Sequence, residues 1–249
     1  MEMTEKLAMC RGTGSYDSQL KSIRLSTETQ PFFGVLHPEL LPYVGQNYDK
    51  TGVLLVGESH YVRQATEEQL EQADWYHSPL PDGTDSPFDK SNGYVGWFDT
   101  REVFVRYMND DRSKGYRIFY EPTAVLHELG LGSGEKYRDF DYFAFMNFFQ
   151  RPSIAEGESI EDSPEDRLAA NDVLEQVVSI LRPRAVVFLS QKAFYAFGKE
   201  RCPDTLFYAV SHPNSPWWYR ARRDGGCARQ DFKNILQEVL RPNSAPGSM

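Results

Sequence analysis

The residues most capable of chemistry in the first quarter of the chain follow directly after a short apolar run. Residues 52–57 are apolar and β-branched, and they end at Gly57, before Glu58, His60 and Tyr61. Glycine lets the backbone turn tightly against a ligand. A carboxylate and an imidazole can hold water or move a proton, and a flat phenol ring can form the wall of a pocket. The pattern is typical of a ligand-binding turn after a buried strand.

Two later apolar runs carry similar groups at their ends. Asn147 lies within the run 140–149, and its amide can both donate and accept hydrogen bonds, so it can read an amide-like edge. His212 follows the run 205–211 and precedes Pro213. A rigid loop therefore holds an imidazole that can donate to a developing negative charge.

Each of these residues also has a purely structural interpretation. A glycine after a strand is most often only a turn, and Glu58 could cap a helix or pair with an arginine. Asn147 could satisfy loop backbone, and His212 could be a structural loop histidine. The tryptophan pair at 217–218 could belong to the core. Short motifs give many false positives when taken singly. The common position of these residues after apolar runs is what favours a functional site.

Four short apolar runs alternate with helical patterns. The strand-like runs are 52–57, 140–149, 184–189 and 205–211, and the helical patterns are 99–108, 118–129, 163–181, 191–198 and 232–240. Strands that alternate with helices are typical of parallel βαβ units. We therefore predict an α/β fold, a three-layer α/β/α sandwich with a central parallel sheet of about four strands. Ligands of such sheets bind beyond the carboxyl ends of the strands.

Length and composition indicate one ordinary globular domain. The 249 residues include 27 basic and 36 acidic side chains, a net charge of −9, which argues against nucleic-acid binding by whole-molecule charge. No apolar run approaches the roughly 18 residues of a transmembrane helix, and the three cysteines lie far apart. We expect a cytoplasmic protein with no membrane partner, metal, cofactor or iron–sulfur cluster. The expected organisation is an irregular N-terminal arm at 1–30, one domain at 31–240 and a disordered tail at 241–249.

One local segment departs from the acidic balance. Residues 217–233 contain five basic and two acidic side chains. The segment begins with these aromatic and basic residues: Trp217, Trp218, Arg220, Arg222 and Arg223. Aromatic rings interleaved with positive charge are typical of a nucleic-acid-binding surface. A solvated helix start explains the charge about as well.

These motifs, in this order, resemble the uracil-DNA glycosylase superfamily over about residues 35–240. Residues 57–61 (GESHY) are similar to the family's first motif, Gly-Gln-Asp-Pro-Tyr-His in one branch and Gly-Glu-Ala-Pro-Gly in another. Residues 145–147 (FMN) occupy the place of the strand that ends in the base-reading Asn. Residues 181–193 (LRPRAVVFLSQKA) are similar to a segment of helix, Arg-Pro, strand and small turn. Residues 212–216 (HPNSP) resemble the second motif, His-Pro-Ser-Pro.

The resemblance implies excision of uracil or a related base from DNA by hydrolysis of the N-glycosidic bond. It implies that His212 stabilises the anionic uracil, that Asn147 reads the edge of the base, and that Tyr61 excludes thymine. Residues 57–58 would shape the turn that faces the base and the phosphate. One of the two tryptophans at 217–218 would wedge into the duplex.

The chain departs from the first motif of the family at two positions. Ser59 stands where one branch has the Asp that orients water, and His60 stands where the family has Pro. Glu58 is then the only acid of the motif, and it could be a general base or a structural ligand of backbone N–H groups. Two rival functions stay open. The first is a non-catalytic protein of the same fold that binds a nucleobase or nucleic acid, and the second is an enzyme acting on another small glycosidic or nucleotide substrate.

Overall fold

The protein is represented by a computed structural model that describes residues 12–60, 74–79, 99–109, 116–132, 138–153 and 159–241. Within these ranges the chain forms a five-stranded sheet with the order β1-β3-β2-β4-β5. The strands are β1 (Tyr43–Val44), β2 (Val53–Gly57), β3 (Phe143–Asn147), β4 (Ala185–Phe188) and β5 (Leu206–Ala209). Strand β1 pairs antiparallel with β3, and the other neighbours pair in parallel.

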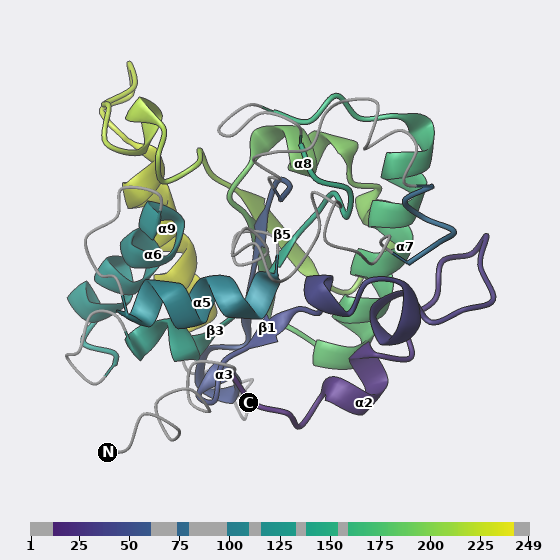
Figure 1. Ribbon diagram of the computed structural model, residues 1–249. Helices are drawn as coiled ribbons and strands as arrows, with labels where there is room; N and C mark the ends of the chain where they lie inside the picture. Colours follow the sequence, from purple (N-terminus) through teal and green to yellow (C-terminus); the bar gives the residue numbers. More distant parts are fainter. Residues whose placement is uncertain are drawn as a thin grey trace, which may run out of the picture.

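Helices lie on both faces of this sheet (Figure 1). The α-helices are α2 (Asp17–Leu20), α3 (Tyr48–Thr51), α5 (Thr100–Asn109), α6 (Arg117–Glu128), α7 (Pro164–Leu181), α8 (Gln191–Ala196) and α9 (Ala228–Val239). Shorter turns of 3₁₀- or π-helix are η1 (Phe32–Leu36), η2 (Pro38–Leu40), η6 (Arg138–Tyr142), η7 (Lys199–Arg201) and η8 (Pro216–Trp218).

Alternating residues of the central strand β2 face two separate hydrophobic clusters. Leu54 and Val56 belong to the cluster that includes residues of α7 and α8, while Val53 and Leu55 belong to the cluster that includes residues of α5, α6 and α9. Because successive side chains of a strand point to opposite faces, a strand buried on both faces must be apolar throughout. This requirement explains why β2 reads as a continuous apolar run.

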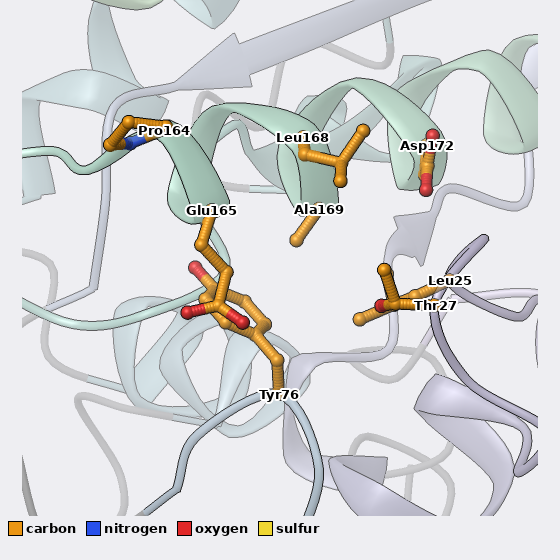
Figure 2. A pocket seen from close by; sticks show the side chains of 8 residues that line it. All are labelled: Leu25, Thr27, Tyr76, Pro164, Glu165, Leu168, Ala169 and Asp172. Carbon is orange, nitrogen blue, oxygen red and sulfur yellow. The ribbon is translucent and has the colours of Figure 1, made fainter.

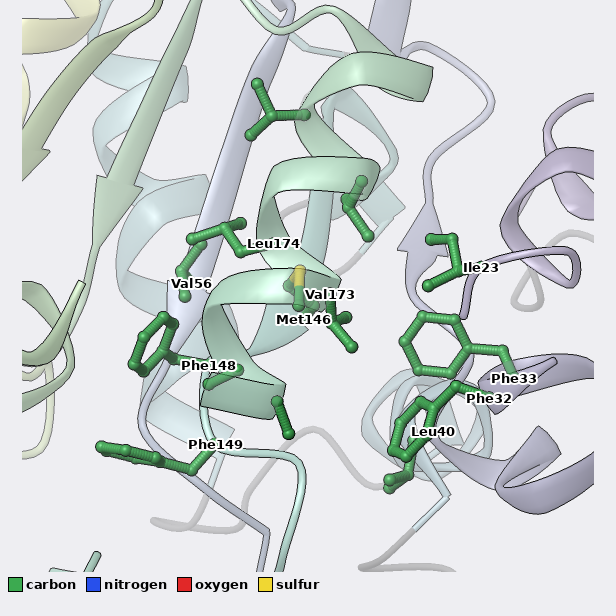
Figure 3. Close-up of a cluster of buried hydrophobic side chains, with 14 of the residues drawn as sticks. Ile23, Phe32, Phe33, Leu40, Val56, Met146, Phe148, Phe149, Val173 and Leu174 are labelled. Carbon is green, nitrogen blue, oxygen red and sulfur yellow. The ribbon is translucent and has the colours of Figure 1, made fainter. Parts of the chain in front are cut away.

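The first cluster contains many of the largest buried side chains (Figure 3). Val56 and Met146 from the sheet lie beside Val173 and Leu174 of α7. Burial of an aliphatic or aromatic side chain of this size contributes about 1.5–3 kcal/mol. The packing of α7 on the sheet is therefore a major source of stability.

The long helix α7 begins and ends where its sequence signals lie. The Ser163 hydroxyl accepts a hydrogen bond from the Asp166 N–H, and the Asp166 carboxylate accepts one from the Ser163 N–H, which together form a capping box. Pro164 occupies the first turn, where its missing N–H costs nothing. Arg182 ends the helix in the left-handed conformation, with φ of 46°.

The predicted α/β architecture is confirmed at the level of a mostly parallel sheet with helices on both faces. The four predicted runs became β2, β3, β4 and β5, whereas the fifth strand, β1, was not predicted because it has only two residues. Residues 12–30 contain the short helix α2 and are otherwise irregular, and Leu20, Ile23 and Leu25 are buried in the core. The segment thus packs on the domain. Most of the expected disordered tail, 242–249, lies outside the described residues, as do residues 1–11.

No helix in the described part of the chain has the length and apolar character needed to span a bilayer.

Candidate functional site

The candidate site lies at the carboxyl edge of the parallel strands, where the direction of strand addition reverses. The chain runs from β2 to β3 on one side and then to β4 on the other side of β2. In open α/β sheets, ligands bind in the crevice at such a switch point. Residues Glu58 and Ser190 follow the two strands that flank it, β2 and β4.

A direct hydrogen bond joins these two strand ends. The Ser190 hydroxyl donates to Glu58 Oε2 at 2.6 Å. The same hydroxyl accepts a hydrogen bond from the Ala193 N–H at 3.2 Å, so Ser190 is also the N-cap of α8. The start of α8 therefore fixes the position of one oxygen of the carboxylate, and the other oxygen remains for a ligand or water.

Asn147 and Gly57 lie side by side at the ends of β3 and β2. They are register partners in the parallel ladder. A Cβ atom placed on Gly57 would come within 2.1 Å of Asn147 Oδ1, so only glycine leaves room for the amide in this position. The Asn147 side chain is half-buried, and its amide has no hydrogen-bond partner among the described residues. The amide is therefore available to a ligand.

The hydrogen bonds of His212 define which ring nitrogen can donate. The N–H of Asn214 donates to His212 Nδ1 at 3.0 Å, so Nδ1 must carry a lone pair. Burial lowers the pKa of the His212 imidazole, and the negative charge of Glu58 offsets part of this effect. At neutral pH the ring is thus uncharged, with its proton on Nε2. His212 follows β5, the strand that lies beside β4 in the sheet.

The turn after β2 runs alongside the segment after β3. The N–H of Phe149 donates to the Glu58 carbonyl at 2.9 Å, and the N–H of Ser153 donates to the His60 carbonyl at 2.7 Å. Ser59 is 6% exposed, and its hydroxyl has no hydrogen-bond partner among the described residues. A buried hydroxyl without a partner costs free energy, so it marks a place where a polar ligand or water would be stabilising.

His60 and Tyr61 are the remaining residues of the first motif. Burial lowers the pKa of His60 to about 3, so this imidazole is neutral. Tyr61, predicted as a wall of the base pocket, lies outside the described residues.

The two tryptophans of the predicted DNA-binding segment have opposite environments. Trp218 is fully buried, packs against Phe232 and donates its indole N–H to Glu121 at 3.1 Å. This corrects the prediction for Trp218, because a core side chain cannot contact DNA without local unfolding. Trp217 is 52% exposed, with the guanidinium of Arg220 4.8 Å from its ring centroid. Only Trp217 therefore remains as a surface aromatic of the pair.

The predicted basic residues of this segment are not equally available. Arg222 forms a two-bond ion pair with Asp231, with distances of 2.5 and 2.9 Å. Arg220 and Arg223 are exposed and form no ion pair with any described residue. The positive charge that DNA could meet is thus smaller than the count of basic residues predicts.

Sequence reasoning did not assign roles to two polar residues that organise this region. Ser190 holds Glu58, and Glu121, only 2% exposed, holds Trp218 and Tyr219. A serine between a strand and a helix could have been recognised as an N-cap. Glu121 gives a weaker signal, an acid that precedes Pro122 inside the helical pattern of α6.

A separate cavity of about 280 Å³ opens at the start of α7 (Figure 2). It is lined by Leu25, Tyr76, Pro164 and Leu168, among others, and it shares no residue with the strand-end cluster. Among the described residues there is no group of three or more His, Cys, Asp or Glu side chains arranged to hold a metal ion.

No protein-family model matches the chain, and no curated protein matches it significantly.

Proposed function

We propose that the protein is a divergent member of the uracil-DNA glycosylase superfamily that excises uracil, or a related base, from DNA. The observation that carries the proposal is the hydrogen-bonding state of His212, a neutral imidazole whose Nε2–H has no acceptor among the described residues. Such a donor suits a base that leaves with negative charge on a carbonyl oxygen. Its position after β5, the strand beside β4, on the same edge of the sheet as Glu58, supports the same conclusion.

The proposed reaction breaks the bond between the sugar C1′ and the base nitrogen. The bonding electrons leave with the base, and the resulting anion accepts a hydrogen bond from His212 Nε2–H. The sugar passes through an oxocarbenium-like state that water attacks. The amide of Asn147 would pair with the edge of the base, because it has no other partner among the described residues.

Glu58 is the group that would act on the water. Its Oε2 accepts the hydrogen bond from Ser190, which leaves Oε1 to accept one from water. As the C1′–O bond forms, the water proton would pass to this carboxylate and then to solvent or to the released base. A positioned general base contributes about 10²–10⁴-fold, so Glu58 compensates in this proposal for the missing acid at Ser59.

A second candidate function is supported by a specific observation at the same place. The carboxylate of Glu58 is already engaged by the N-cap serine of α8, and the Ser59 hydroxyl cannot polarise water as a carboxylate would. The alternative is a protein that binds a nucleobase in this site and does not cleave the bond.

Uracil release from an oligonucleotide tests the proposal and separates it from the alternative. A labelled strand with one uracil would be incubated with the protein, and abasic sites would be revealed by alkaline cleavage. We expect cleavage with the wild type and strong loss with His212→Ala, with Tyr195→Ala as a control because Tyr195 is 80% exposed. No abasic sites, together with saturable binding of free uracil that requires Asn147, would support the binding function. If the protein neither releases uracil nor binds it, both the glycosylase function and the binding function are refuted.

A further inference from the structure

An exposed surface of alternating rings and guanidinium groups follows the His212 loop. Trp217 and Tyr219 are each 52% exposed, while Trp218 between them is fully buried. The guanidinium of Arg220 lies 4.8 Å from the Trp217 ring, and that of Arg117, on α6, lies 5.9 Å from the Tyr219 ring. The segment is the yellow-green loop near α6 and α9 in Figure 1.

One buried carboxylate binds two residues of this segment. Glu121 Oε2 accepts the indole N–H of Trp218 at 3.1 Å, and Glu121 Oε1 accepts the hydroxyl of Tyr219 at 2.5 Å. Arg229 lies 3.8 Å from the same carboxylate and balances its charge. Trp218 is anchored inward and Tyr219 is held through its hydroxyl, while the rings of Trp217 and Tyr219 are both exposed at the surface. Rings that are ordered before binding lose less conformational entropy when a ligand stacks on them.

The charge around the rings is positive and unpaired. Arg117, Arg220 and Arg223 are exposed and form no ion pair with any residue that the structure describes. The nearby Arg222 differs, because Asp231 neutralises it. Exposed aromatic rings beside free arginines fit a ligand that has both flat rings and negative charge.

We infer that this surface, defined by Arg117, Trp217, Tyr219, Arg220 and Arg223, is a stacking platform for single-stranded nucleic acid. Unpaired bases stack on the two rings, and the arginines contact the phosphates. Double-stranded nucleic acid does not offer its base faces, so the platform discriminates in favour of single strands. The inference rests on the proposed function only in that both name nucleic acid as the partner.

Binding of a uracil-free single strand tests the platform independently of base excision. Fluorescence anisotropy of a labelled thymidine oligonucleotide would be measured with the full chain. We expect Trp217→Ala and Tyr219→Ala each to weaken binding of the oligonucleotide by about 5- to 150-fold. Tyr195→Ala is the matched control, because Tyr195 is a more exposed aromatic residue on α8. Wild-type affinity in both ring variants would overturn the inference.

Salt dependence tests the role of the arginines. For single strands, each phosphate contact contributes about 0.7 to the slope of log affinity against log salt concentration. Arg220→Gln should flatten the slope by about this amount. Arg222→Gln, the matched control, should not, because Arg222 is engaged by Asp231. Equal slopes for Arg220→Gln and wild type would contradict the platform.

The remaining outcomes separate the platform from other functions. Strand binding that needs Trp217 but is not accompanied by uracil release would refute the proposed glycosylase and leave the platform standing. Uracil release with no effect of Trp217→Ala on strand binding would refute the platform and leave the proposed glycosylase standing. If the wild type binds no strand and instead self-associates through Trp217, the surface is a protein interface and the inference is wrong.

Discussion

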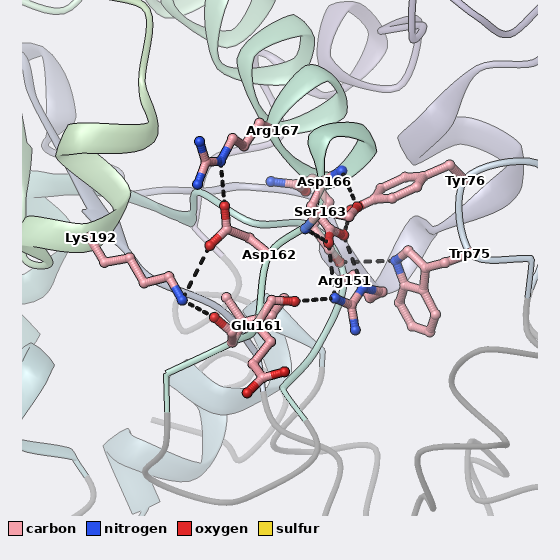
Figure 4. A network of polar contacts seen from close by, with 11 residues as sticks. Trp75, Tyr76, Arg151, Glu161, Asp162, Ser163, Asp166, Arg167 and Lys192 are labelled. Atoms are coloured by element: carbon pink, nitrogen blue, oxygen red, sulfur yellow. Dashed lines mark hydrogen bonds and ion pairs between the residues drawn. The ribbon is translucent and has the colours of Figure 1, made fainter.

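Replacement of Asp166 by asparagine should test how strongly the start of α7 stabilises the protein. Asp166 is 1% exposed and accepts two hydrogen bonds of 2.9 Å from Arg151, together with one of 2.6 Å from the Tyr76 hydroxyl (Figure 4). It also accepts the Ser163 N–H as part of the capping box. The Asp166→Asn variant keeps the shape of the side chain but removes its charge.

The expected cost follows from the burial of this pair. Removing one partner of a buried ion pair costs about 3–5 kcal/mol. We expect about 3 kcal/mol for Asp166→Asn, at the lower end of that range. The reason is that Arg151 keeps 21% of its side chain exposed and also donates to the Glu161 carbonyl at 2.9 Å. With a urea m-value of about 3 kcal/mol/M, the unfolding midpoint should fall by about 1 M.

Urea unfolding, followed by circular dichroism, measures this difference. Asp231→Asn is the matched control, because Asp231 also accepts two hydrogen bonds from one arginine but lies at the surface. Exposed ion pairs contribute little, so the control should unfold close to the wild type. If Asp166→Asn and Asp231→Asn shift the midpoint equally, burial does not set the strength of the network and the reasoning is wrong.

The same pair predicts a dependence of stability on pH. Burial alone would raise the pKa of Asp166, but hydrogen bonds from Arg151, the Ser163 N–H and Tyr76 outweigh it and hold the pKa below its usual value. A carboxyl whose folded pKa is depressed stabilises the protein above its unfolded pKa of about 3.9. This contribution is lost as the pH falls through the folded pKa. The difference in unfolding free energy between wild type and Asp166→Asn should therefore shrink below about pH 4.

The remaining predictions concern the strand-end site. His212→Ala should lower uracil release by about 10²–10³-fold with unchanged folding, because the imidazole would stabilise charge that develops only in the transition state; equal rates for the variant would remove this role. Gly57→Ala should push the Asn147 amide aside and raise the KM for the uracil-containing strand. The Tm should fall only slightly, because the clash is with the end of a side chain. An unchanged KM would contradict this geometry. Glu58→Gln should slow release by about 10²–10⁴-fold if Glu58 is the base. If Ser59→Asp creates release that is absent from the wild type, the wild type is a binding protein.

The sheet was predictable because its strands are signalled locally. β2, β3 and β4 are buried along almost their whole length and read as short apolar runs. The edge strand β5 also reads as an apolar run, although Leu206 is exposed and its other residues are only partly buried. A buried strand needs an apolar residue at every position, and this requirement does not depend on what the rest of the chain does. By contrast, β1 has two residues, and pairing of such a short segment is decided by its neighbour β3.

The contacts within the candidate site were less predictable because they join distant parts of the chain. Ser190 and Glu58 are 132 positions apart, and Trp218 and Glu121 are 97 apart. Trp217 and Trp218 are the same residue type in adjacent positions, so no local pattern separates the exposed ring from the buried one. The distinction arises only when α6 brings Glu121 to the indole N–H of Trp218.

The charge available to a nucleic acid is likewise a tertiary property. Counted along the sequence, residues 217–233 are basic, yet Arg229 and Lys233 both donate to Glu128 at the end of α6. The same helix supplies Arg117, about 100 positions earlier than the segment it joins, as a free positive charge beside Tyr219. At the C-terminal end of α6, Glu128 neutralises the charges of Arg229 and Lys233, and at its N-terminal end Arg117 supplies a positive charge. The unpaired positive charge of the folded protein therefore lies beside the exposed rings, where a single strand would contact it.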